Sequence, residues 1–542
     1  LLLYSSLLFS LLATSQNTVG VITNTSQSYN GYTLFTSYTE TFLINNCGQV
    51  VQQWVSTFNP GNSVYLLENG NLLRTGRTSS NDIVFGGQGG VIELYSWEGN
   101  LLWQYYYDTP QYRQHHDIFP MPNGNVLILA AKVMTNAQAI QAGRNPAMLP
   151  QSVLYSEQIV EVQPIGSNQG AIVWEWDIKD HLIQDFDATK DNFGVVSQNS
   201  NKLDINFTNG GNGNSNWLHV NSVQYNANLN QIVLSSRNLS EIWIIDHSTT
   251  TAQATAGSGG TYGKGGDLLY RWGNPQAYKI GTELDRKLFG QHYPHWIPNG
   301  LIDAGKIILF NNGNGREPLF SEVFIINPPT TTPGFYVLNT NNTFGPQSPD
   351  YIYADTSASP SPFSSNILSG ANRLPNGNIL ICEGNTGEIF EIDNQENTVW
   401  KYINPIHGIT GVRAVQGGNP PAVRSLFRAT RYSENYPAFI GKDLTPGSPI
   451  ELNSQINVAC SILGIDEYQI PDLVVSPNPT SDVVRVNSAV EIDKIEVYTI
   501  LGTKMRTVLK SESIDLSEFQ SGIYLLKIFA ANAILTKKVI KQ

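Results

Sequence analysis

Three histidines stand at matching positions in separate copies of a sequence repeat. His116 and His292 each lie six residues before the proline of a Pro-Asn-Gly turn, and His219 begins the equivalent segment of a third copy. Equivalent positions of a repeat fold into equivalent places, so the three imidazoles are predicted to converge on one spot. Histidine exchanges protons near neutral pH and binds metals, which makes this spot the candidate for chemistry.

The residues beside the histidines indicate which chemistry. Three imidazoles suit zinc or copper and leave one coordination position open. Asn221 follows His219 by two residues and so faces the same side of a strand, and Arg237 is predicted on the next strand. A permanent cation beside a metal ion is repulsive, whereas guanidinium, imidazole and amide groups together bind an oxyanion such as sulfate or phosphate. We therefore predict a site for a tetrahedral anion rather than for a metal ion.

Other residues near this site have two interpretations. His115 competes with His116, although the hairpin register favours His116. Arg428, in the last copy of the repeat, lines the mouth of the site and binds substrate, or it forms a structural ion pair. His295 is predicted to point to the opposite face of its strand from His292. The remaining histidines, His181, His247 and His407, are predicted on the surface.

The elements that must position these residues come from six copies of the repeat. Each copy contains a strand of the pattern acidic, aliphatic, aromatic, aliphatic, at residues 39–45, 90–96, 156–162, 240–246, 321–327 and 387–393. A second strand follows, which tends to end on a core Trp, and a third leaves an Asn-Gly turn. Six unevenly spaced copies predict an all-β protein with a six-bladed β-propeller over residues 17–465, because solenoid repeats are shorter and more even. The histidine strands are then innermost, and insertions at 177–216 and 247–290 border the channel mouth.

The composition agrees with this fold class and restricts the partners. Only 14% of the 542 residues are charged and 10% are aromatic, while Gly, Asn, Ser and Thr separate the apolar runs, as in β proteins with many turns. The net charge of −12 belongs to the region before residue 472. An acidic domain without a basic stripe is a poor partner for nucleic acid or an anionic membrane. A small anionic substrate stays compatible, because a few cations in a pocket outweigh net charge.

Residues 1–16 form an apolar run that ends in small residues, which predicts a signal peptide. No other segment approaches about twenty apolar residues, so no membrane-spanning segment is predicted in the mature protein. The 3 cysteines exclude a disulfide framework and a Cys-rich metal site. The cysteines have two interpretations. Cys47 and Cys460 form one bridge between the first and last blades, or all three cysteines, Cys382 included, are small buried thiols.

After a linker at 466–471, residues 472–542 carry the short alternating strands of a small β-sandwich-like module. Pro477-Asn478-Pro479, Leu501-Gly502, Ser521-Gly522-Ile523-Tyr524 and a final Lys-rich strand follow in that order. This order resembles the C-terminal sorting domain of cargo for the type IX secretion system. The resemblance implies the type IX machinery as a partner and a secreted or cell-surface location, reached through the periplasm and outer membrane. An accessory binding sandwich is the alternative.

Within residues 30–440, the motifs HHDI…PNG, WLHVNS, SSR and QH, in this order, resemble the bacterial arylsulfate sulfotransferases. The resemblance implies an enzyme without a cofactor that moves a sulfuryl group from a phenolic sulfate ester to another phenol. No nucleotide donor takes part, so the implied partners are a small aryl sulfate donor and a phenolic acceptor. Tyr293 departs from the family's pattern, which usually has an acidic residue at this position.

The family's motifs also imply roles for the site residues. His292 matches the nucleophile, which carries the transferred group as a sulfohistidine. Arg237, His116 and Asn221 hold the three sulfuryl oxygens, and His219 protonates the leaving phenolate and later deprotonates the acceptor.

A different class of function competes with this one. The chain is alternatively a non-catalytic cell-surface propeller that binds glycans or a protein partner and keeps its histidines for packing. A metal- or quinone-dependent propeller dehydrogenase is less favoured, because no acidic calcium-type cluster accompanies the histidines.

Overall fold

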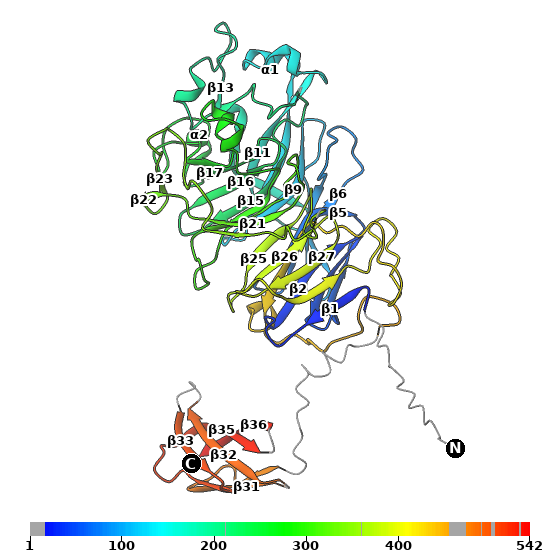
Figure 1. The fold of residues 1–542 in the computed structure, drawn as a ribbon, viewed down its shortest axis with the longest axis vertical. Coiled ribbons are helices and arrows are strands. Elements are labelled where there is room, and N and C mark those ends of the chain that lie inside the picture. The colour runs from blue at the N-terminus through cyan, green and yellow to red at the C-terminus, as the bar shows by residue number, and fades with distance from the viewer. Residues whose placement is uncertain are drawn as a thin grey trace, which may run out of the picture. The chain divides into compact units, whose positions relative to one another are not determined.

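The computed structural model describes residues 17–211, 213–358, 360–454, 473–488, 490–499, 504–530 and 533–542. The chain divides into two compact units, one up to Gln455 and one from Ile456. Strands dominate, which confirms the prediction of an all-β protein, and α1 (Asn136–Gln141) and α2 (Thr251–Ala254) are short (Figure 1). The predicted signal peptide at 1–16, the linker at 466–471 and Cys460 lie outside the described residues.

Six antiparallel sheets of four or five strands form the framework of the described part of the larger unit, and we name them S1 to S6. In order they are β29-β2-β3-β4 (Ala429–Ser433, Gly31–Ser37, Glu40–Asn45, Val50–Val55), β5-β6-β7-β8 (Pro60–Leu66, Leu72–Arg77, Gly90–Tyr95, Leu101–Tyr106), β9-β10-β11-β12 (Tyr112–Pro120, Val126–Thr135, Val153–Ile165, Gln169–Asp177), β15-β16-β17-β18 (Val220–Asn226, Gln231–Ser236, Glu241–Asp246, Tyr270–Trp272), β19-β20-β21-β24 (His292–Trp296, Ile307–Asn311, Glu322–Ile326, Tyr351–Tyr353) and β25-β26-β27-β28-β1 (Gly370–Arg373, Ile379–Glu383, Glu388–Ile392, Thr398–Ile403, Gly20–Asn24).

The connecting loops contain short elements. They are the two-stranded sheets β13-β14 (Leu182–Ile183, Leu203–Asp204) and β22-β23 (Thr330–Thr332, Phe335–Tyr336), and the 3-10 turns η1 (Pro146–Met148), η2 (Ile178–His181), η3 (Val196–Gln198), η4 (Pro275–Tyr278), η5 (Glu283–Asp285) and η6 (Pro437–Phe439).

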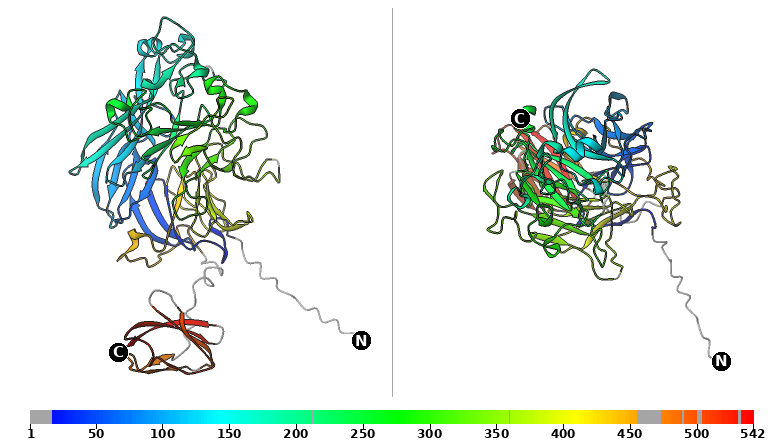
Figure 2. Two further views of the ribbon diagram at one scale, coloured as in Figure 1. Left: turned by 90° about the vertical axis from the view of Figure 1, so that its left-hand side faces the viewer. Right: turned by 90° about the horizontal axis from the view of Figure 1, so that it is seen from above.

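Sheet S1 joins the two ends of the larger unit. Its edge strand β29 pairs with β2, from Gly31 opposite Ser433 to Phe35 opposite Ala429. The first strand of the larger unit, β1, pairs with β28 of S6. The blue N-terminal strands therefore lie beside the yellow strands near residue 400 in every view (Figures 1 and 2).

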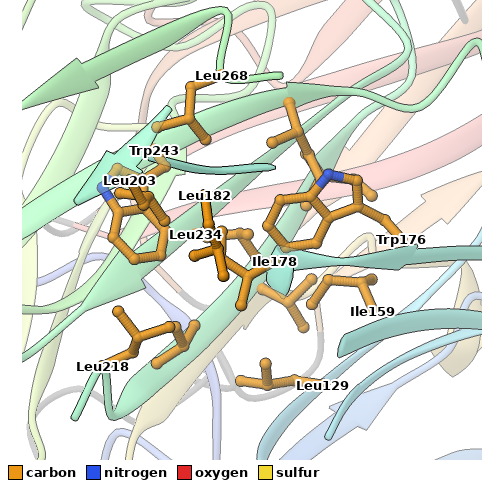
Figure 3. Packing of buried hydrophobic residues seen from close by; sticks show 14 of the residues in the cluster. Leu129, Ile159, Trp176, Ile178, Leu182, Leu203, Leu218, Leu234, Trp243 and Leu268 are labelled. Atoms are coloured by element: carbon orange, nitrogen blue, oxygen red, sulfur yellow. The ribbon is translucent and has the colours of Figure 1, made fainter. Parts of the chain in front are cut away.

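Buried apolar side chains fill the space between each sheet and the next. Between S3 and S4, Leu129 and Ile159 of one sheet pack with Leu234 and Trp243 of the other (Figure 3). Equivalent clusters join S1 to S2, S2 to S3, S4 to S5, S5 to S6 and S6 to S1. Each sheet thus buries apolar side chains against both neighbours, and the last sheet packs on the first.

A side-chain hydrogen bond from the outer strand of each sheet also reaches the next sheet. Trp54 Nε1 donates to Ser96 O, Trp103 Nε1 to Gln169 O, Trp174 Nε1 to Thr249 Oγ1, Trp272 Nε1 to Pro346 O, the Tyr351 hydroxyl to Glu396 Oε1 and Trp400 Nε1 to Asn46 O. A buried indole N–H needs such a partner. The repeated Trp, predicted as core, is therefore also a link between sheets.

The C-terminal unit contains two sheets. They are β30-β31-β34 (Val474–Ser476, Val483–Asn487, Ser513–Asp515) and β33-β32-β35-β36 (Lys504–Leu509, Ile492–Thr499, Gly522–Ala530, Ala533–Lys541). Alternating residues of both sheets, such as Val484, Ile495 and Leu526, contribute to one apolar cluster. Period-two alternation in the sequence therefore places one face of each sheet in a common core.

Candidate active site

The edge strands that carry the three histidines contact one another: β9 contacts β15, and β15 contacts β19. Each histidine lies at or beside a shift in strand register, where the backbone is left-handed. The φ angle is 51° at His116, 47° at His219 and 55° at Tyr293, directly after His292. Bulges re-aim side chains, and such backbone persists only where surrounding contacts hold it. The same backbone feature therefore positions all three imidazoles.

Short contacts place these residues around one space: the Arg237 backbone N–H donates to His219 O at 3.2 Å, and Asn221 Nδ2 donates to the carbonyl of Gln291, directly before His292, at 2.8 Å. Burial, followed by the charges of His219, His115, His292 and Arg237, lowers the pKa of His116 well below its ordinary value. Burial, followed by Arg237, His115 and His292, does the same to the pKa of His219. The ring centroids of His116 and His219 are 4.7 Å apart. The structure thus brings His116, His219, His292 and Arg237 together, with neutral imidazoles at physiological pH.

The hydrogen of His292 is fixed on Nδ1. This atom lies 2.7 Å from Asn312 Oδ1, while Asn312 Nδ2 donates to the carbonyls of Ser365 and Leu368 at 2.7 and 2.9 Å. Because the amide nitrogen is committed to two acceptors, Oδ1 must accept from the ring. Burial, and next Arg237, lowers the pKa of His292 to about 3. Asn312 thus leaves the lone pair of the neutral His292 ring on Nε2, and the Gly290 backbone also forms a hydrogen bond with the ring.

His219 has the opposite arrangement. Its Nδ1 lies 2.7 Å from Asn216 Nδ2, and an amide nitrogen can only donate, so the neutral ring carries its hydrogen on Nε2. Asn216 Oδ1 is buried and has no partner among the described residues. If the amide turned over, Oδ1 would accept from a hydrogen on Nδ1. The Asn216 amide is thus able to serve both protonation states of the ring.

His116 belongs to a chain of three side chains. Its Nδ1 lies 2.8 Å from His115 Nδ1, and His115 Nε2 lies 2.8 Å from Glu157 Oε2. The side chains of His115 and Glu157 are 0% and 1% exposed. Of the two histidines that the sequence leaves open, His116 has its ring against His219, and His115 lies behind it.

Arg237 follows β16 directly and is half-buried. Among the described residues no carboxylate lies within ion-pair distance of it, and the one hydrogen bond of its guanidinium there is to Asn238 Oδ1, 3.4 Å from Nη1. With Arg286 and Gly290 it lines a cavity of about 360 Å³. Arg286, by contrast, is paired with Glu283 at 2.9 Å. An unpaired guanidinium beside imidazoles at a cavity wall is the arrangement expected for an anion site.

Asn221 and Arg428 are both buried, and both have partners. Asn221 Nδ2 donates to Gln291 O at 2.8 Å, which leaves one amide hydrogen for a ligand, and Oδ1 has no partner among the described residues. Arg428 Nη1 and Nη2 contact the two oxygens of Asp117 at 3.2 and 3.0 Å, and its guanidinium lies 3.7 Å from the Tyr293 ring centre. Burial opposes the charge, but Asp117 raises the pKa of Arg428. Of the two interpretations of Arg428, the geometry shows the ion pair.

A loop between β6 and β7 covers two of the rings. The Phe85 ring lies 6.4 Å from that of His116, nearly parallel to it, and 6.2 Å from that of His219. A Cβ on Gly87, where φ is 85°, would lie 2.1 Å from His116 Nε2, so only glycine fits. Sequence reasoning missed this loop, although the run Phe-Gly-Gly-Gln-Gly-Gly at 85–90 was a usable signal.

Glu157, Asn216 and Asn312 were also missed. Each hydrogen-bonds a histidine ring nitrogen, yet none lies on the histidine strands: Glu157 is in β11, Asn216 precedes β15 and Asn312 follows β20. Their part in the site is visible only when neighbouring strands are aligned in space.

The prediction that His181 lies on the surface is wrong. Its side chain is 0% exposed, with Nδ1 2.8 Å from Asp267 Oδ1 and Nε2 2.7 Å from Ala254 O. The ring stacks on Trp176 of S3 at 5.6 Å. The insertion that carries His181 folds back on its own sheet, which turns a loop histidine into a core residue.

The other histidines lie away from the site. His295 lines a second cavity of about 890 Å³, and His116, His219 and His292 line neither this cavity nor the one beside Arg237. His247 is half-buried and pairs with Glu161 at 2.9 Å, and His407 is half-buried. In the described part of the chain, no group of three or more His, Cys, Asp or Glu side chains has the arrangement of a metal site.

The comparison with known families decides the identity of the larger unit. The profile of the family described as Arylsulfotransferase (ASST) matches residues 23–404, well over half of the chain. The chain belongs to the arylsulfotransferase family. Membership supports arylsulfotransferase activity in general and agrees with the resemblance seen in the histidine motifs.

The C-terminal unit of this arylsulfotransferase-family chain matches a second family. The profile described as Secretion system C-terminal sorting domain matches residues 474–542. This tail implies export by the type IX machinery to the cell surface or the outside. Within the described ranges, no helix has the length and apolar character needed to cross a membrane.

Solved structures add only distant likenesses. A protein of unknown function from Bacteroides caccae is 11% identical, with a TM-score of 0.38, and the match covers 75% of this chain and 100% of that one. A putative 6-phosphogluconolactonase from Bacteroides fragilis is 10% identical, with a TM-score of 0.33 and coverage of 75% and 99%. The periplasmic gluconolactonase of Pseudomonas aeruginosa is 9% identical, with a TM-score of 0.34 and coverage of 74% and 99%. Curated proteins include no match.

Proposed function

We propose that this protein is a six-bladed β-propeller enzyme that transfers a sulfuryl group from a phenolic sulfate ester to another phenol through a sulfohistidine on His292, without a nucleotide. The six sheets S1 to S6 are the blades, and the edge strands that carry the histidines lie at the channel. Residues 17–465 form the propeller, and 472–542 form a sorting domain with a sandwich of two sheets.

The proton on His292 Nδ1 is the observation that carries the proposal. Asn312, held by Ser365 and Leu368, forces this tautomer, and the pKa of about 3 keeps the ring neutral. A neutral imidazole with its lone pair on Nε2, beside a guanidinium that no described carboxylate pairs, is an activated nucleophile facing an anion site.

In the first half-reaction the Nε2 lone pair of His292 attacks sulfur, and the bond from sulfur to the aryl oxygen breaks. Arg237, the remaining amide hydrogen of Asn221 and His116 hold the three sulfuryl oxygens, whose charge grows in the transition state. The sulfurylated ring becomes cationic and keeps its Nδ1 hydrogen bond to Asn312, which supports the intermediate.

His219 takes part by proton transfer. His219 is neutral in the free protein, but the bound sulfate ester adds a negative charge to the site, and His219 takes up one proton from solvent with it. As an imidazolium it gives its Nε2 hydrogen to the leaving phenolate, and in the second half-reaction the same Nε2 accepts the hydrogen of the incoming phenol. That phenol's oxygen attacks sulfur, the N–S bond breaks and its electron pair returns to His292. This cycle keeps a hydrogen on His219 Nδ1, so Asn216 must present Oδ1, which is buried and unpartnered in the described structure.

The aryl group of the donor packs against Phe85, because this half-buried ring lies within 6.5 Å of the His116 and His219 rings. Stacking of two aromatic rings contributes about 0.5–1.5 kcal/mol beyond the area that it buries.

The test uses p-nitrophenyl sulfate as donor. Wild type is expected to release one equivalent of nitrophenolate in a burst and to carry an acid-labile SO3 group on the peptide that contains His292, detected by mass spectrometry. Adding phenol should discharge the label and form phenyl sulfate.

His292→Ala is expected to lose both the burst and the label, while His407→Ala, which changes a histidine away from the site, should keep them. Label on another residue, or turnover by His292→Ala, would refute the mechanism. A folded wild type without any transfer would favour the binding-protein alternative.

A further inference from the structure

We propose that Glu157 is a positioning residue of the same site, acting through His115 to hold His116 with a hydrogen on Nε2 directed at the bound sulfuryl group. The inference rests on the proposed function and adds a residue on which donor binding depends.

Glu157 joins the two strands that carry His116 and His219. Its Oε2 lies 2.8 Å from His115 Nε2, and its Oε1 accepts the backbone N–H of Val220 at 3.0 Å. Val220 directly follows His219. A single buried carboxylate therefore fixes one edge of the His115 ring and the backbone beside His219.

Two arrangements of hydrogens satisfy this chain of groups. In the first, neutral His115 donates from Nε2 to Glu157 and accepts at Nδ1 from His116, which leaves a lone pair on His116 Nε2. In the second, one more proton makes His115 an imidazolium that donates to both Glu157 and His116 Nδ1, so neutral His116 keeps its hydrogen on Nε2.

Only the second arrangement binds a sulfuryl oxygen, because a lone pair would repel it. The Glu157 carboxylate can form an ion pair with this imidazolium, because its Oε2 lies 2.8 Å from His115 Nε2, whereas an amide at this position cannot. The additional proton comes from solvent when the anion binds, and it stays on His115 through the reaction.

The other copies of the repeat show what this position does elsewhere. Glu40, Glu241, Glu322 and Glu388 occupy the same place in their repeats and pair with Arg413, Arg271, Arg316 and Lys401. All four are ion pairs with a permanent or strong cation. In S3 the partner is instead a histidine next to the site, so this copy of a structural pair contains a titratable group.

The charged groups around the two histidines come from four elements. Glu157 approaches from β11, His219 from the start of β15, His292 from β19 and Arg237 from the end of β16. In the described part of the chain, Glu157 is the only carboxylate that pairs with either His115 or His116. Asp117, the next residue along, is bound by Arg428.

Glu157→Gln is the decisive variant, because it keeps the shape and the acceptor for Val220 but removes the charge. With p-nitrophenyl sulfate and phenol at pH 7, kcat/KM for the donor is expected to fall by about 10- to 100-fold, less than the 10²–10³-fold typical of deleting an oxyanion donor.

Glu161→Gln is the matched control. Glu161 lies four residues further along β11 and pairs with His247 at 2.9 Å, away from the site. The same change of carboxylate to amide there should leave the kinetics unchanged. Glu157→Asp keeps the charge and should retain more activity than Glu157→Gln; the reverse order would show that shape matters and charge does not.

Two further readouts separate positioning from general structure. In a His116→Gln background, Glu157→Gln should cause no further fall in kcat/KM for the donor. In an Arg286→Ala background, the fall caused by Glu157→Gln should be the same as in wild type. Nitrogen NMR of the histidine rings in the presence of inorganic sulfate should show His116 protonated at Nε2 in wild type and at Nδ1 in Glu157→Gln.

The NMR measurement requires no turnover, so it decides the role of Glu157 even if wild type transfers no sulfuryl group and the proposed function fails. An unchanged His116 tautomer in folded Glu157→Gln, additive effects with His116→Gln, or equal behaviour of Glu157→Gln and Glu161→Gln would each overturn the inference.

Discussion

Arg237 and Arg428 both lower the pKa of His292, yet their surroundings are opposite. Arg428 is bound by both oxygens of Asp117 and by the Tyr65 hydroxyl, and it lies over the Tyr293 ring. Arg237 has no carboxylate within ion-pair distance among the described residues and borders the 360 Å³ cavity.

The difference separates a structural charge from one kept for a ligand. A buried cation is costly unless it is paired, and Asp117 completes the pair for Arg428. Around Arg237 the fold leaves the pair incomplete, and we infer that the sulfuryl anion completes it. Tyr293, at the position where the family usually has an acidic residue, serves the structural arginine instead.

Arg237→Ala should give the largest effect on activity. Loss of the free guanidinium is expected to lower kcat/KM for the donor by up to about 10³-fold, without lowering the free energy of unfolding, since no ion pair is broken. Arg286→Ala, which removes a paired arginine from the same cavity, serves as the control in steady-state assays. Equal losses in both variants would mean that net positive charge, and not Arg237, binds the anion.

Asp117→Asn tests the other arginine. The amide leaves Arg428 charged and buried without a counter-ion, so the free energy of unfolding should drop by about 3–5 kcal/mol in urea denaturation. Asp393→Asn, which changes a half-buried turn carboxylate that pairs with no cation among the described residues, should lower stability far less. A stable Asp117→Asn would contradict the structural role of the pair.

The protonation of His292 gives a smaller effect. Because its folded pKa is about 3, the His292 ring stays neutral between pH 8 and pH 5. Protonation of His292 should therefore not lower the amplitude of the p-nitrophenyl sulfate burst over this range. The unfolded ring titrates near 6.5, so the ring's contribution to stability is complete above about pH 6.5 and is lost as the pH falls toward 3. His292→Gln should weaken this acid dependence, measured as unfolding free energy against pH. Arg237→Ala should raise the pKa of His292, because it removes a nearby positive charge. A titration midpoint of His292 near 6.5 in wild type would show that burial and Arg237 do not depress this pKa.

Phe85→Ala should give the smallest effect. Loss of one stacked ring, about 0.5–1.5 kcal/mol, corresponds to a rise in KM for the donor of roughly 2- to 10-fold. Aliphatic sulfate esters, tested beside aryl sulfates, should show no such change. If Phe85→Ala affected both classes alike, the loop would act by covering the histidines rather than by binding the aryl group.

The repeat in the sequence was sufficient to predict the all-β class and to select His116, His219 and His292, because equivalent positions in a repeat share a place in the fold. It did not predict which nitrogen of each ring carries the hydrogen. That information lies in Asn216, Asn312 and Glu157, whose contacts depend on side-chain reach between strands and leave no fixed spacing in the chain.

Arg428 shows a second limit of the sequence. A cation in the last repeat is equally compatible with a ligand for substrate and with half of an ion pair. Only the position of Asp117, two repeats away and across the edge strands, separates these interpretations. The surface prediction for His181 was wrong for a related reason. The loop that carries His181 folds back onto Trp176, and no periodicity in the sequence reveals this contact.

The pairing of β29 with β2 has a consequence for biogenesis. Contacts such as that of Arg431 with Thr33 join residues 398 positions apart, so forming them is entropically costly and slow. A polypeptide that emerges N-terminus first cannot complete S1 until residue 433 has arrived. Because the sorting tail is encoded after this last strand, every molecule that bears the export address also has the segment needed to finish folding.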